Sequence, residues 1–202
     1  ALHRAVAELA RSCGATVFMA VHAAVAVLLD RLGAGTDTAV GTPVAGRADT
    51  ALDDLVGFFV NTVALRADTA GNPSVRDLLR RVRDADVAAF AHADLAFDRV
   101  VETVNPDRRP HRHPLFQVML ALRDADPELA LPGVRVTSRT VPTGVAQFDL
   151  TLDLVQHRDS TGITGDLEFD AELYDWPLIE AMADRLPRLL AAMITDPDDP
   201  ID

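Results

Sequence analysis

Six histidines and one cysteine are the residues of this chain with the clearest capacity for acid–base, nucleophilic or metal chemistry. An imidazole can act as a general base or metal ligand, and a thiolate can act as a nucleophile. His111 and His113 form an H-x-H pair in a proline-rich and charged stretch, but two ligands do not make a zinc site without a third. No two histidines are adjacent, so the sequence favours a solvated basic loop over a metal site.

Other catalytic patterns are missing from the sequence. It contains no G-x-S-x-G elbow, no glycine-rich phosphate loop and no lysine, which excludes a Schiff-base lysine and a P-loop lysine. Cys13 lies in an apolar helical context, which favours a small core residue. The chain by itself therefore predicts no catalytic residue and no metal site.

Charge and cysteine content restrict the partners and the compartment. The formal net charge of −12 disfavours nucleic acid and anionic membranes as partners. A lone cysteine cannot form an internal disulfide, which predicts a reducing, cytoplasmic setting. We expect no membrane-spanning segment and no signal peptide.

The stretch VGFFVNTVALR, residues 56–66, places an asparagine inside an apolar run. Gly57 permits close approach of a backbone or ligand, and Phe58 and Phe59 supply apolar bulk. If the stretch is a strand, Asn61 shares a face with Phe59, and its amide can both donate and accept hydrogen bonds. Two interpretations stay open: Asn61 braces neighbouring backbone, or it faces a ligand that contains amides.

Hydrophobic periodicity predicts the elements that must position these residues. Predicted helices cover residues 1–14, 15–33, 73–94, 97–104 and 175–194, with Thr16, Ser74 and Asp175 as N-caps. Predicted strands cover residues 38–46, 58–68, 115–124, 134–141, 148–156 and 163–173. Pro43 predicts an edge strand or strand end, and alternation in the last two strands predicts an antiparallel pair. The order indicates a single α/β unit.

Four stretches of the sequence resemble, in the same order, the later core motifs of the condensation domains of nonribosomal peptide synthetases. They are VGTPVAGR (40–47), LVGFFVNTVALR (55–66), HADLAFDRVVE (92–102) and RPHRHPLFQVML (109–120). The resemblance continues through QFDLTLDL (147–154) and the last helix. The GFFVNT core resembles the amide-forming type rather than the epimerisation type.

The sequence also departs from the family pattern. Ala93, Ala96 and Asp98 replace the usual Gln, Pro and Glu of the third motif, and His111 and His113 replace Ser and Asn in the fourth. The family's reaction depends on a His-His-x-x-x-Asp-Gly motif in the N-terminal lobe, and this chain has no His-His pair. The chain therefore resembles only the C-terminal lobe.

The resemblance implies an α/β, chloramphenicol acetyltransferase-like lobe, in which a mixed β-sheet is packed with helices. Residues 1–195 would form the C-terminal lobe, and residues 196–202 would start the linker towards an adenylation domain. This half would supply one wall of a tunnel, together with a strand that crosses to the N-terminal lobe. It would not be active alone.

The resemblance also implies the reaction in that tunnel: a carrier-bound acceptor amine would attack a carrier-bound donor thioester. Each substrate would be held by a phosphopantetheine arm, which serves as its tether. This lobe itself would bind no cofactor. The predicted tunnel residues are Gly57, Phe58, Phe59, Asn61, Gln147 and Asp149. Arg80 and Arg83, on a predicted arginine-rich helix face, are predicted to contact acidic peptidyl carrier proteins, although a solvated face paired with nearby aspartates is the simpler interpretation.

Two alternative functions remain at this stage. The chain could be a lobe of another CoA- or carrier-dependent acyltransferase or of an epimerisation-type domain, or a docking module without chemistry. The sequence does not identify the amino acids joined.

Overall fold

The structure is a computed structural model that describes residues 2–47, 50–52, 54–107, 112–125, 131–134, 136–137, 141, 143–157 and 162–202. The α-helices are α1 (Leu2–Ser12), α2 (Val17–Leu29), α3 (Val75–Phe90), α4 (Phe97–Val104) and α5 (Trp176–Thr195). The strands are β1 (Asp37–Ala45), β2 (Val60–Asp68), β3 (Val118–Asp124), β4 (Leu150–His157) and β5 (Gly162–Phe169). A π-helical turn, η1 (Asp30–Ala34), and a 3-10 turn, η2 (Thr50–Leu52), complete the order.

The strands form one mixed sheet in the order β2-β1-β3-β4-β5. β1 pairs with β2 and β4 pairs with β5 in antiparallel fashion, whereas β3 is parallel to both β1 and β4. The predicted antiparallel hairpin is confirmed, with Leu152 opposite Leu167. The predicted strand 134–141 falls partly outside the described residues, and Val134 forms an isolated bridge with Leu131.

Pro43 lies inside β1, a strand of nine residues. β1 pairs with β2 along its whole length but with β3 only at Val40 and Gly41. Pro43 therefore sits where β1 has one neighbour, so its missing N–H leaves no ladder bond unmade on the other side.

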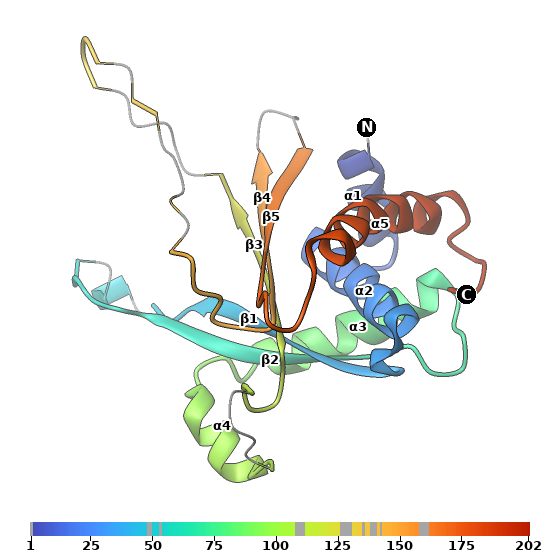
Figure 1. The fold of residues 1–202 in the computed structure, drawn as a ribbon, viewed down its shortest axis with the longest axis horizontal. Coiled ribbons are helices and arrows are strands. Elements are labelled where there is room, and N and C mark those ends of the chain that lie inside the picture. The colour runs from blue at the N-terminus through green and yellow to red at the C-terminus, as the bar shows by residue number, and fades with distance from the viewer. Residues whose placement is uncertain are drawn as a thin grey trace.

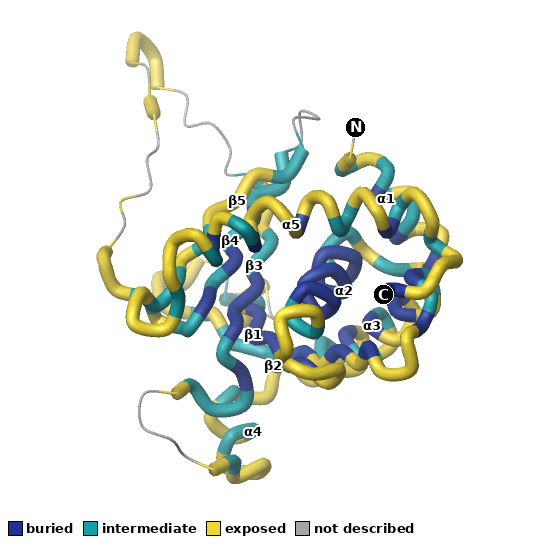
Figure 2. The backbone as a smooth tube through the Cα atoms, turned by 45° about the vertical axis from the view of Figure 1, so that its right-hand side comes forward, coloured by how far each residue is buried: buried dark blue, intermediate teal, exposed yellow. Residues whose placement is uncertain are grey.

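Helices α1, α2, α3 and α5 cover one face of this sheet (Figure 1). α2 lies at the centre of that layer and is buried along most of its length, as its uniformly apolar sequence predicts (Figure 2). By length and composition, the stretch 17–34 could also span a membrane, contrary to our expectation, but 56% of it is buried inside the protein. A core helix accounts for that composition.

The predicted helix caps are confirmed. The side chains of Thr16, Ser74 and Asp175 accept hydrogen bonds from the backbone N–H groups of Met19, Asp77 and Leu178. The predicted fold class, a mixed sheet packed with helices, is confirmed as well.

Candidate functional site

Asn61 uses its side-chain amide to hold the turn that precedes α4. Its Nδ2 donates to the carbonyls of Ala93 (2.9 Å) and Leu95 (2.8 Å), and its Oδ1 accepts the backbone N–H of Phe97 (3.2 Å). No side chain of the turn itself caps α4, so Asn61 satisfies the first N–H of that helix from across the fold. These hydrogen bonds join the second and third sequence motifs.

Four aromatic rings continue this connection into the later motifs. The ring of Phe97 stacks on His113 with centroids 5.4 Å apart, and His113 lies 4.3 Å from Phe116 and 4.9 Å from Phe148. Such tilted and edge-to-face geometries are the favourable ones for aromatic pairs. We call these four residues the ring cluster, and three of the motifs each contribute to it.

The ring cluster packs against β1 at Gly41. A Cβ built at this position would overlap ring atoms Cε2 and Cζ of Phe116, which is only 1% exposed. Gly41, the first glycine of VGTPVAGR, is therefore needed because it lets the buried ring of Phe116 lie directly on the strand. All the motifs on which the resemblance rests converge at this place, which we call the motif junction.

His113 is half-buried at the motif junction, and the other member of the H-x-H pair, His111, lies outside the described residues. Its Nδ1 is buried and has no hydrogen-bond partner within the described part of the chain. On its outer side, a cavity of about 550 Å³ is lined by residues of α4 and of the loop before β3. Among the residues that the structure describes, no three His, Cys, Asp or Glu side chains are grouped to hold a metal ion.

Gln147 and Asp149 flank Phe148 at the entry to β4, and they differ in burial. Gln147 is exposed and Asp149 is half-buried. Burial raises the pKa of the Asp149 carboxyl, while the positive charge of Arg112 acts in the opposite direction. Tyr174 also has a raised pKa, first because of its own burial and then because of the negative charge of Asp149.

Phe58 and Phe59 precede β2, because the strand begins at Val60 rather than at residue 58 as predicted. The Phe59 carbonyl accepts the N–H of Gly46 (2.5 Å), and the Arg47 guanidinium lies 4.1 Å from the centre of the Phe59 ring. Arg47 also donates to the carbonyls of Leu52 and Leu55, so it braces this loop.

The other side of the same loop is exposed. Val56 and Phe58 are 103% and 89% exposed, and Leu55 and Val60 are exposed too. The closest neighbour of a Cβ at Gly57 would be the ring of Phe59, so this glycine accommodates a local contact. Of the tunnel residues predicted in this segment, Phe59 and Asn61 are therefore packed against the protein. Phe58 instead belongs to an exposed row of apolar residues, which we call the apolar row: Leu55, Val56, Phe58 and Val60.

The arginines of α3 already have partners within the chain. Arg80 pairs with Asp77 at 2.7 Å, and Arg83 pairs with Asp84 and donates to the Cys13 carbonyl. Cys13 itself is buried, as predicted. These contacts agree with the simpler interpretation of a paired, solvated helix face.

A family model described as "Condensation domain" matches residues 1–202. The chain belongs to the condensation domain family.

Two curated relatives are each 48% identical to this chain over 98% of its length. One, of Salinispora arenicola, is named "Probable non-canonical nonribosomal peptide synthetase (NRPS) CymA", and the other is the dimodular nonribosomal peptide synthase of Bacillus subtilis. The condensation-domain chain spans only 2% and 9% of these proteins. It also superposes on the X-domain from teicoplanin biosynthesis with a TM-score of 0.90 and 31% identity, over 99% of this chain and 46% of the other.

Asn61→Ala is expected to destabilise this condensation-domain chain by about 2–3 kcal/mol, since three hydrogen bonds of about 1 kcal/mol each are lost. Chemical denaturation of the purified variant measures the change. Asn61→Asp retains the acceptor for Phe97 but places a carboxylate against two carbonyls, so we expect at least the same loss.

Gln147→Ala is the matched control, because it removes an exposed amide from a neighbouring motif. We expect it to change the free energy of unfolding by less than about 0.5 kcal/mol. If Asn61→Ala were as mild as this control, Asn61 would not brace the turn, and ligand contact would be its remaining role.

Proposed function

We propose that this chain is the C-terminal lobe of a condensation domain and forms one wall of the tunnel in which an amide bond joins carrier-bound donor and acceptor. The observation that carries the proposal is the superposition, in which the whole chain accounts for 46% of an X-domain chain. The sequence has no adjacent histidines, and the family resemblance assigns the His-His-x-x-x-Asp-Gly motif to the other lobe. This lobe alone would then be inactive.

The outward apolar row supports contact with a second lobe. Leu55, Val56, Phe58 and Val60 are all exposed in one short segment, and the Arg47 contacts hold that segment in place. A fixed, exposed apolar segment is typical of an interaction surface. We assign its occupant as the N-terminal lobe.

The face of the sheet that no helix covers has the polar character expected of the wall of a water-accessible channel. Leu150, Leu152 and Leu154 pack towards the helices, so the alternate residues of β4 point to the opposite face. On that face Asp153 lies opposite Asp166 in the register of β4 and β5. A polar sheet face of this kind fits a solvated tunnel better than a packed core.

The finer assignments are parts of the same proposal. Gly57, Phe58, Phe59 and Asn61 border the tunnel near the lobe junction, and Gln147 and Asp149 border it at the start of β4. Phosphopantetheine arms deliver the substrates, and Arg80 and Arg83 can exchange their aspartate partners for an acidic carrier protein. An adenylation domain is the proposed neighbour in a multidomain synthetase.

Reconstitution tests the proposal. The purified chain is mixed with a condensation-domain N-terminal lobe that carries the histidine motif, and with loaded donor and acceptor carriers. We expect amide formation only when both lobes are present. Product formation by this chain alone would contradict the assignment.

The interface is tested in the same mixture. Phe58→Asp is expected to weaken binding of the two lobes by about tenfold or more, because an aromatic anchor is lost and a charge is placed in an apolar contact. Val87→Asp is the matched control, since Val87 is also an exposed apolar residue but is not a member of the apolar row. Equal binding by both variants would exclude the row as the interface.

A further inference from the structure

The C-terminal residues 196–202, which the family resemblance predicts to start a linker, are packed against the first turn of α3. Ile201 is only 7% exposed, and its N–H donates to the Pro73 carbonyl at 3.1 Å. The Arg31 guanidinium donates to the Ile201 carbonyl, and the N–H of Asp202 donates to the Asn72 side chain. The segment is thus held at several points by residues distant in sequence.

The same segment caps α3. The first N–H of this helix, that of Val75, donates to the Asp199 carbonyl at 3.2 Å, and the next, that of Arg76, donates to the Pro197 carbonyl at 3.0 Å. The Ser74 side chain accepts the third N–H, that of Asp77, and the Leu78 N–H makes the first ordinary helical bond to the Ser74 carbonyl. The N–H groups of the first three helical residues, which have no partner inside the helix, are therefore all satisfied, two of them only by the C-terminal segment.

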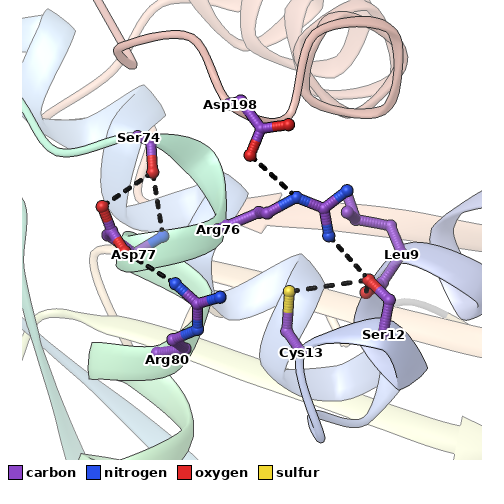
Figure 3. Close-up of polar contacts among 8 residues, drawn as sticks. All are labelled: Leu9, Ser12, Cys13, Ser74, Arg76, Asp77, Arg80 and Asp198. Carbon is purple, nitrogen blue, oxygen red and sulfur yellow. Dashed lines mark hydrogen bonds and ion pairs between the residues drawn. The ribbon is translucent and has the colours of Figure 1, made fainter.

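Arg76 connects this cap to α1. Its Nε donates to Asp198 at 3.0 Å, and its Nη1 donates to the Ser12 hydroxyl at 2.9 Å, as Figure 3 shows. In the next turn, Ser74 and Arg80 both bond to Asp77. Two separate polar groups therefore flank the start of α3: Asp198, Arg76 and Ser12 link the C-terminal segment to α1, and Ser74, Asp77 and Arg80 lie on α3 itself.

We propose that residues 196–202 act as a clamp that maintains the first turn of α3 and fixes the place from which a following domain would start. The reference to a following domain rests on the proposed function, whereas the clamp itself does not. Displacement of this segment would remove the acceptors of the Val75 and Arg76 N–H groups, and with them two of the hydrogen bonds that hold the first turn of α3.

Amide hydrogen exchange, followed by NMR on the 202-residue chain, tests the clamp. In a chain that ends at Thr195, exchange of the Val75 and Arg76 amides is expected to accelerate by about tenfold or more relative to that of Leu79, because their acceptors are gone. Asp198→Asn keeps those acceptors but removes the ion pair, and it should accelerate exchange about two- to fivefold.

The salt dependence of amide exchange distinguishes the contribution of the Arg76–Asp198 ion pair from a general change in stability. In the unmodified chain, exchange at Val75 and Arg76 should rise between about 0.05 M and about 0.5 M salt, whereas the Asp198→Asn variant should show no such rise. Arg188→Gln, which breaks an exposed pair with Asp184 on α5, is the matched control and should leave both amides unchanged.

Unchanged exchange at Val75 and Arg76 in the shortened chain would overturn the clamp. If the shortened chain fails to fold, the Asp198→Asn variant decides: the same salt dependence as in the unmodified chain would overturn it. Neither result bears on amide formation, which the reconstitution measures, so the clamp and the proposed function can fail separately.

Discussion

Gly41→Ala is expected to destabilise the protein by about 3 kcal/mol or more, because a single methyl group overlaps a buried ring and overpacking of a tight core carries penalties of this size. The added Cβ would occupy the space of Cε2 and Cζ of Phe116. The strand cannot withdraw, since Gly41 pairs with Ala64 on one side and with Met119 on the other. Urea denaturation, with fluorescence and circular dichroism followed together, measures the loss.

A second-site change shows whether Phe116 is the cause. Phe116→Leu alone removes a buried ring, but combined with Gly41→Ala it provides room for the methyl, so the double variant should be clearly more stable than the sum of the single losses predicts. Gly71→Ala is the matched control, since a Cβ there meets no atom within 4 Å. It should cost only about 1–2 kcal/mol from its positive φ. Additive losses in the double variant would disprove the contact.

Local signals in the sequence were sufficient for most of the elements. Ser74 followed by apolar residues at helical spacing predicts α3, and alternation predicts β4 and β5, because both depend on neighbours within a few residues. The start of β2 was misplaced by two residues because Phe59 is held by Gly46 and Arg47, a contact that its own segment does not encode.

The candidate site was predicted less completely. The sequence presents an asparagine in an apolar run but cannot show its partners, since the turn at residues 93–97 lies more than thirty positions away. The ring cluster was missed altogether, although Phe97, Phe116 and Phe148 each stand inside a motif. That recurrence was the available signal, but the packing of the rings depends on tertiary structure.

His22 has a partner that the sequence could not indicate. Its Nδ1–H donates to both carboxyl oxygens of Asp86, at 3.0 and 3.1 Å. Both side chains are fully buried, one on α2 and one on α3. No local pattern links positions 64 residues apart.

His22→Leu is expected to destabilise the protein by about 3–5 kcal/mol, because it leaves the Asp86 carboxyl buried without its donor. The apolar replacement fits the surroundings of α2, so the loss would come from the stranded carboxyl rather than from a cavity. Denaturant titration of the purified chain measures it.

The double variant His22→Leu/Asp86→Leu decides between these causes. An apolar pair of similar volume can replace a buried polar pair at little net cost, so we expect the double variant to recover more than half of the loss. Recovery would show that this pair specifies how α2 and α3 are placed, and that its contribution to stability is small. A loss equal to the sum of the single variants would instead mean that each side chain acts through separate contacts, and that α3, with its clamp and its arginine face, is positioned against α2 by packing alone.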